Sequence, residues 1–69
     1  MYKDGFAEKL KKARNNTGFT QEQVSNETKI PRSTLANYEL GRTEPDIETL
    51  GILIDFYNID SRWLLGTQK

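Results

Sequence analysis

The chain has 69 residues with ten basic and ten acidic side chains, so its formal net charge is zero and its length suits a single domain. It contains no cysteine and no histidine, which excludes disulfides, thiolate or imidazole metal sites and imidazole catalysis. No apolar run approaches the ~18 residues of a membrane-spanning helix. The lack of cysteine fits a reducing cytosol, and nothing in the sequence predicts a cofactor, a metal or a small-molecule ligand.

The charges are unevenly distributed along the chain. Residues 1–43 carry eight basic and five acidic side chains, a net charge of +3. Residues 44–69 carry two basic and five acidic side chains, a net charge of −3. We therefore expect a polyanion to bind the first two thirds of the chain, although a neutral total is unusual for a nucleic-acid-binding domain.

Residues 5–17 form the first segment with helical periodicity. One face of it carries Phe6, Leu10, Ala13 and Thr17, at spacings of four, three and four residues. Asp4 is placed to cap the start of this helix. Gly18 is placed to end it in the left-handed conformation.

A second helix is expected at residues 21–28, after a capping box. Thr20 and Gln23 have the spacing at which each side chain bonds the other residue's backbone N–H. Val24 and Thr28 lie on one face of the segment and are expected to point inward. The helix is short, so its packing must come from neighbouring elements.

A third helix is expected at residues 31–40. Pro31 suits its first turn, where a missing N–H costs nothing, and Gly41 ends it. Leu35 and Tyr38 form its inward face, and Ile30 is a core residue in the tight turn before it. The side chains left on the outer face are Arg32, Ser33, Ala36 and Asn37.

Two further helices complete the predicted fold. The fourth, at residues 47–57, begins after the cap Asp46, ends at Asn58, and carries at helical spacing Ile47, Leu50, Leu53, Ile54 and Tyr57. A last short helix contains Trp63, Leu64 and Leu65, with Asp60 or Ser61 as its cap. With no strand signal, these segments predict an all-α, compact five-helix bundle at residues 1–66 and a flexible tail at residues 67–69.

The second and third helices have the features of a helix-turn-helix. Such a unit needs a short helix, a tight turn and a second helix with a polar outer face. Arg can donate two hydrogen bonds to guanine, Asn can pair with adenine, and small Ala or Ser side chains fit beside base edges. The start of the second helix presents unpaired N–H groups to a phosphate, beside Gln21. Arg42 and Thr43 follow the third helix, where they can contact the backbone on its other side.

Several short motifs at fixed spacing resemble the Cro/phage-repressor-type (XRE) helix-turn-helix family. They are Arg14, Gly18-Phe19-Thr20-Gln21, Tyr38-Glu39-Leu40-Gly41, Pro45, Leu50 and Trp63-Leu64-Leu65-Gly66. Together they cover about four fifths of the chain. The resemblance implies a lambda-repressor-like bundle that binds specific double-stranded DNA sequences as a transcriptional regulator, more often a repressor. It also implies a prokaryotic or phage-encoded protein of the cytoplasm.

The resemblance also assigns roles to individual residues. Base-edge contacts fall on Arg32, Ser33, Ala36 and Asn37. Phosphate contacts fall on Gln21, Thr34, Arg42 and the backbone near Thr43. Arg14 and Glu39 are implied to form an internal ion pair that ties the first helix to the third. Lys29 stands in the turn where the family usually has glycine, so we expect either a lysine at positive φ or a slightly different turn, with an added cation beside the third helix.

The fourth helix has more apolar residues than one buried face needs. Ile52 and Phe56 are four residues apart and form a ridge on another side, which Trp63 extends. We expect these three residues to form part of a homodimer surface. The alternative is that they complete the core of a monomer.

Two other functions remain to be compared with DNA binding. The acidic fourth and fifth helices favour a protein-interaction module as the second hypothesis, in which the polar face of the third helix is simply solvated. An enzyme is disfavoured, because the chain has no histidine, cysteine or glycine-rich phosphate loop. The carboxylates between residues 44 and 48 are explained by helix capping and the helix dipole.

Overall fold

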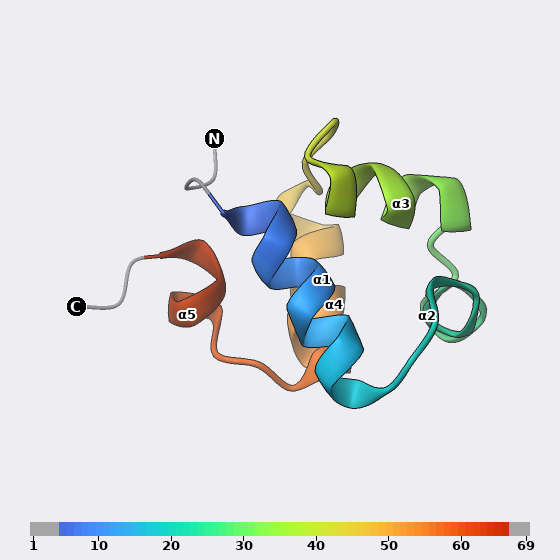
Figure 1. Ribbon diagram of the computed structural model, residues 1–69, viewed down its shortest axis with the longest axis horizontal. Helices are drawn as coiled ribbons and strands as arrows, with labels where there is room; N and C mark the ends of the chain where they lie inside the picture. Colours follow the sequence, from blue (N-terminus) through green and yellow to red (C-terminus); the bar gives the residue numbers. More distant parts are fainter. Residues whose placement is uncertain (1–4, 67–69) are drawn as a thin grey trace.

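The computed structural model describes residues 5–66, which form five α-helices and no strand (Figure 1). They are α1 (Phe6–Thr17), α2 (Gln21–Thr28), α3 (Arg32–Leu40), α4 (Ile47–Tyr57) and α5 (Ser61–Leu65). The all-α, five-helix prediction is therefore confirmed. The expected cap Asp4 and the expected tail at residues 67–69 lie outside the described residues.

Side-chain caps begin three of the helices. The Thr20 hydroxyl accepts from Gln23 N at 3.1 Å while Gln23 Oε1 accepts from Thr20 N at 2.8 Å, which completes the predicted capping box. Asp46 accepts from the Thr49 N–H and Asp60 from the Arg62 N–H. Side-chain hydrogen bonds from Thr49 and Arg62, followed by these backbone bonds, lower the pKa of the two carboxyls. At α1 the N-cap position is instead Gly5, with no side-chain cap.

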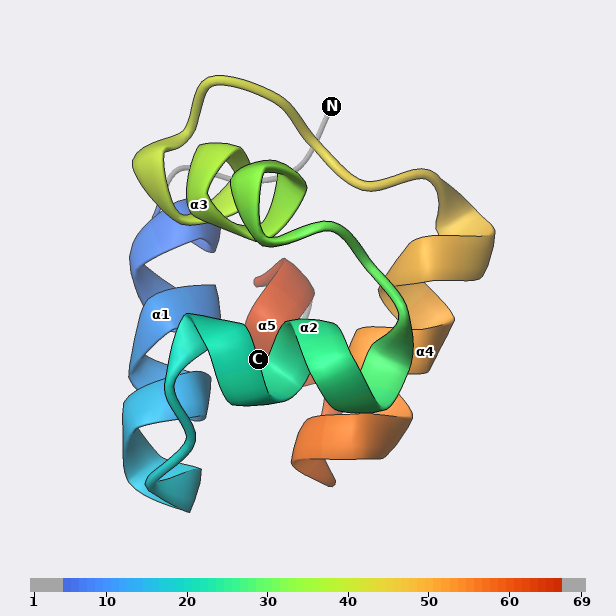
Figure 2. The same ribbon diagram turned by 90° about the vertical axis from the view of Figure 1, so that its right-hand side faces the viewer.

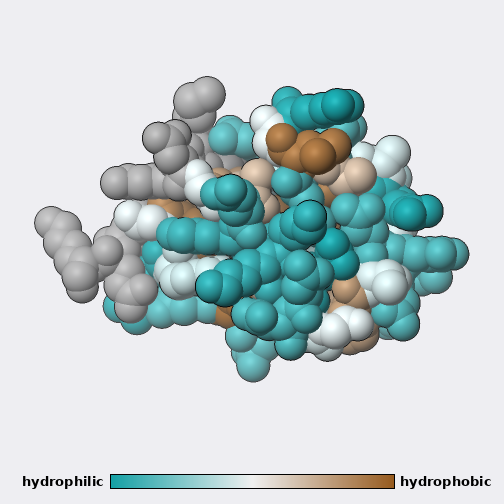
Figure 3. All heavy atoms as spheres, in the orientation of Figure 1, coloured by the Kyte–Doolittle hydropathy of each residue, from teal (hydrophilic) through white to brown (hydrophobic). Residues whose placement is uncertain are grey.

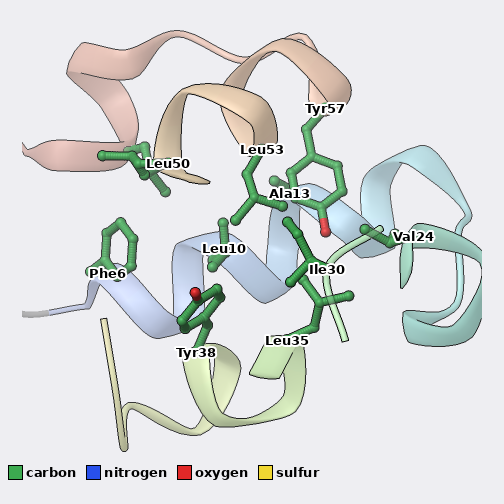
Figure 4. Packing of buried hydrophobic residues seen from close by; sticks show 11 residues of the cluster. Phe6, Leu10, Ala13, Val24, Ile30, Leu35, Tyr38, Leu50, Leu53 and Tyr57 are labelled. Atoms are coloured by element: carbon green, nitrogen blue, oxygen red, sulfur yellow. The ribbon is translucent and has the colours of Figure 1, made fainter. Parts of the chain in front are cut away.

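The core is one apolar cluster to which every helix contributes (Figure 4). Its buried residues are Phe6, Leu10, Ala13, Val24, Ile30, Leu35, Tyr38, Leu50, Leu53, Tyr57 and Leu64. Helix α1 packs against α3, α4 and α5, while α2 packs against α3 and α4. Figures 1 and 2 show α2 and α3 together on one side of α1, with α5 on the other.

Two residues that share the helical spacing of the core residues are not buried. Thr17 is exposed, and its hydroxyl donates to the Arg14 carbonyl at 2.7 Å. Ile47 is 80% exposed, although it shares the helical spacing of the α4 core residues. Both residues occupy the last or first position of a helix. Periodicity continues to the end of a helix, but the neighbouring element that would cover the side chain does not.

Lys9 and Trp63 fasten α5 to α1. The Lys9 ammonium donates to the Trp63 carbonyl at 2.9 Å and lies 5.7 Å from the centroid of the indole ring. A helix of five residues is too short to be stable alone. These contacts, together with the fully buried Leu64, hold α5 in place.

Tyr57 brings a polar atom into the core. Its side chain is 4% exposed, and its hydroxyl has no hydrogen-bond partner among residues 5–66. Burial raises the pKa of Tyr57 to about 12, and the nearby charge of Glu39 adds to the effect, since both disfavour the phenolate.

We expect Tyr57→Phe to raise the free energy of unfolding by about 1 kcal/mol at neutral pH, because it removes a buried hydroxyl that has no partner. The unfolded tyrosine ionises near pH 10 and the folded one at about 12. The parent therefore loses stability from this group as pH rises through that window, and the variant does not. Urea unfolding at pH 7 and across pH 9–12 measures both effects. A variant less stable than the parent at pH 7 would contradict the account.

Candidate nucleic-acid interface

Helix α3 has one side in the core and one side towards solvent. Leu35 and Tyr38 are 1% and 8% exposed and anchor the inner side. Among the residues assigned to base edges, Arg32 and Ser33 are exposed, while Ala36 and Asn37 are half-buried. The surface seen in Figure 3 is mostly hydrophilic. The polar side of α3 therefore stands clear of the bundle, most fully in the first turn of the helix.

The turn between α2 and α3 is three residues long. Helix α2 ends at Thr28, whose hydroxyl donates to the Val24 carbonyl at 2.7 Å and accepts from Ile30 N at 3.3 Å. Lys29 follows with φ 68°, and its N–H donates to the Ser25 carbonyl at 2.9 Å. The left-handed lysine is thus one of the two expected outcomes. It costs roughly 1 kcal/mol relative to a less crowded backbone conformation.

Arg14 is at the centre of a buried polar network, and the structure contains the ion pair with Glu39 that the family resemblance implies. Its Nε and Nη2 atoms donate to the two Glu39 carboxylate oxygens at 2.8 and 3.0 Å. Its Nη1 donates to the Phe19 carbonyl at 2.9 Å. The two side chains are only 12% and 4% exposed, and the bond to Glu39 raises the Arg14 pKa. The network joins α1, the chain entering α2, and α3.

Gln21 is a further member of this network, which sequence reasoning missed. Its Nε2 donates to Glu39 Oε1 at 3.1 Å. The two residues are eighteen positions apart, so no periodic pattern could reveal the contact. The amide keeps its second N–H, and Gln21 lies in the first turn of α2. The carboxylate on α3 thereby holds this side chain at the start of α2.

The segment after α3 holds two of the residues assigned to phosphates. Gly41 ends the helix with φ 77°, and the Arg42 N–H donates back to the Asn37 carbonyl at 3.0 Å. Arg42 and Thr43 are both exposed, whereas Thr34 is half-buried within α3. Arg32 and Arg42 thus flank the two ends of one short helix.

The three residues expected on a dimer surface have different surroundings. Ile52 is 43% exposed. Phe56 is half-buried, with its ring centroid 5.1 Å from that of Phe19, and Trp63 is half-buried beside Lys9. Two apolar side chains, Leu40 and Ile47, are more exposed than Ile52 and were not anticipated as such. They are 65% and 80% exposed.

The remaining features concern other kinds of site. Within residues 5–66, no three His, Cys, Asp or Glu side chains group closely enough to hold a metal ion. An open pocket of about 300 Å³ lies between α1 and the α4–α5 region and includes no residue of α2 or α3. None of the described helices has the length and apolar character to cross a membrane.

Comparison with known proteins gives consistent matches. The profile of the family described as "Helix-turn-helix domain" matches residues 7–68. The chain is 37% identical over 61 residues to the HTH-type transcriptional regulator ImmR of Bacillus subtilis, covering 88% of this chain and 48% of that protein. It is 35% identical over 60 residues to the SPbeta prophage-derived regulator YonR of Bacillus subtilis, covering 87% and 56%.

A more distant match is the HTH-type transcriptional activator BcrR of Enterococcus faecalis, 28% identical over 64 residues, covering 93% of this chain and 31% of that protein. The chain spans about half the length of ImmR and YonR. In each of these relatives, the shared region is therefore one part of a longer protein.

We expect Glu39→Gln to lower the free energy of unfolding by about 3 kcal/mol, because it leaves the buried Arg14 charge facing a neutral amide. Urea denaturation at pH 7 measures the loss. Arg62→Ala is the matched control, since the Arg62–Asp60 pair is 69% and 42% exposed and is worth less than about 1 kcal/mol. Equal stability of the two variants would show that the buried pair contributes no more than the exposed one.

Proposed function

Because the chain belongs to the Cro/phage-repressor-type (XRE) helix-turn-helix domain family, we propose that it is the sequence-specific DNA-binding part of a transcriptional regulator. Residues 1–66 form the DNA-binding domain in this proposal, and α3 reads the major groove. The observation that carries the proposal is the orientation of α3. Its apolar side is locked into the core by Leu35 and Tyr38, and Arg32 and Ser33 are exposed on the opposite side.

The outer side of α3 has the chemistry of direct base recognition. The guanidinium of Arg32 can donate two hydrogen bonds to guanine, and the amide of Asn37 can pair with adenine. Ala36 leaves room for a base edge or contacts a thymine methyl group, and Ser33 can bond either a donor or an acceptor. Since Arg32 and Ser33 lie in the first turn, the N-terminal end of α3 enters deepest into the groove.

Phosphate contacts on both sides of the groove fix the position of α3. Gln21 is held by Glu39 at 3.1 Å, which keeps its free N–H at the start of α2. In this proposal the hydroxyl of Thr34, which is half-buried in α3, also bonds a phosphate. Arg42 and Thr43 are exposed just beyond the other end of the helix, where they can bind the opposite backbone.

We assign the protein the role of a repressor that occupies an operator and blocks polymerase in a bacterial cytoplasm. Occupancy needs only a DNA-binding surface, which the described bundle can supply. The relatives come from bacteria and are named as transcriptional regulators, one of them as an activator.

We also propose that the protein binds DNA as a homodimer through a surface containing Ile52, Phe56 and Trp63. A two-fold dimer would place two copies of α3 in successive major grooves, ~34 Å apart. Ile52 is exposed, and Phe56 and Trp63 remain half-buried after packing on their own chain. A partner chain could cover the rest of these side chains.

On the cognate duplex, Arg32→Ala should weaken binding by about 1–3 kcal/mol and relax the preference at one base pair. Arg42→Ala should weaken all duplexes alike and flatten the dependence of affinity on salt, because it removes a phosphate contact. Selection from random duplexes supplies the cognate sequence, and fluorescence anisotropy across salt concentrations measures both variants. If both variants bound DNA like the parent, α3 would not be the helix that recognises the bases. A protein-interaction module would show no steep dependence of duplex binding on salt.

If the homodimer forms as proposed, Ile52→Glu should shift its sedimentation mass towards that of the monomer, because the new charge would be buried at the interface. Ile47→Glu is the matched control, since Ile47 is exposed on the same helix but lies outside the proposed surface. A monomeric parent at high concentration, on and off DNA, would exclude the dimer. So would equal masses for the parent and the Ile52 variant.

A further inference from the structure

The turn between α2 and α3 contains a backbone conformation that its residue does not favour. Two non-glycine residues among those described have positive φ, Lys29 at 68° and Asn58 at 55°. Asn is common in this conformation because its short polar side chain can bond nearby backbone. Lysine has no such compensation, and its Cβ crowds the following carbonyl oxygen. Glycine would take the same conformation without this contact.

No contact within the bundle explains why a lysine occupies this position. Its side chain is exposed, and its ammonium makes no hydrogen bond or ion pair with any residue in the range 5–66. Other basic side chains are used inside the protein. Arg14 binds Glu39, and Lys9 binds the Trp63 carbonyl. The left-handed conformation itself ends α2, because the Lys29 N–H caps the Ser25 carbonyl. No contact of the side chain among the described residues accounts for a lysine rather than a glycine there, which points to a partner outside the fold.

The position of Lys29 indicates what that partner is. The residue lies two positions before Pro31, the N-cap of α3, and three before Arg32. Figure 2 shows the turn connecting the end of α2 to the start of α3 at the rim of the α2–α3 unit. When the first turn of α3 enters a major groove ~12 Å wide, the phosphates at the groove edge lie beside this turn. A lysine is a compact positive charge on a flexible four-carbon stem, suited to a phosphate.

We propose that Lys29 binds a backbone phosphate of the duplex next to the N-terminal end of α3. This inference rests on the proposed function and adds a contact to it. The Lys29 side chain is exposed, and the crowding at its positive φ is the cost of having a cation rather than a glycine there. Since a phosphate carries no base identity, the contact adds affinity for every sequence equally.

Lys29→Gly tests the cost in stability and the gain in affinity separately. It relieves the backbone strain, which should stabilise the fold, and it removes the cation, which should weaken DNA binding. We expect the melting temperature to rise by roughly 4 °C. Affinity for duplex DNA should fall roughly fivefold at low ionic strength, equally for cognate and unrelated sequences. The slope of log affinity against log salt should be shallower by about 0.9. Thermal denaturation and fluorescence anisotropy measure these changes.

Three further variants complete the test. Lys29→Asn also tolerates positive φ without a charge and should reproduce the loss of affinity, and Lys29→Arg should retain the parent's binding and salt slope. Lys12→Ala removes an exposed cation from α1 and should leave the salt slope unchanged. A parent that binds DNA with a slope equal to that of Lys29→Gly overturns the inference and leaves the proposed function standing. A parent that binds no duplex at low salt overturns both.

Discussion

The arrangement of the first three helices depends on one buried ion pair. Arg14 and Glu39 meet at 2.8 and 3.0 Å, and Arg14 also binds the Phe19 carbonyl. A charge that is mostly covered, as Arg14 is at 12% exposure, requires several partners because its desolvation is expensive. The network meets that requirement by joining α1, the segment before α2, and α3. The same carboxylate positions Gln21, so the structural pair and a residue of the proposed DNA surface share one group.

The apolar core, together with the ion pair, fixes the orientation of α3. Leu35 and Tyr38 hold the inner side of α3, and Val24 and Ile30 fill the space beneath the turn. With this side fixed, Arg32 and Ser33 are left exposed on the outward side of the helix. A rigid scaffold of this kind lowers the entropy that a recognition helix would lose on binding DNA. The proposed role of α3 in base recognition therefore depends on its packing against the core as much as on its own polar side chains.

Stability is not maximised everywhere in this small domain. Tyr57 buries a hydroxyl with no partner among the described residues, and Lys29 adopts a conformation better suited to glycine. The two features differ in what they imply. Tyr57 points into the core, where only the fold is affected, whereas Lys29 is exposed beside α3. For this reason we relate only the lysine to an external ligand, and we regard the tyrosine as a site where stability can be gained.

The sequence alone determined the helices, because capping signals and periodicity are local. The Thr20–Gln23 box, the Asp46 cap and the glycine at position 41 set helix ends that the structure reproduces. The motif spacing also resembled that of the family, and this resemblance implied the Arg14–Glu39 pair, which the structure contains. Only the tertiary structure decided which apolar residues are covered: Ile47 shares the period of Leu50 but is 80% exposed, while Phe56 packs against Phe19. It also decided that Gln21 meets Glu39. Such contacts depend on where elements distant in the sequence end and cross in space, and the spacing of residues along the sequence does not encode these positions.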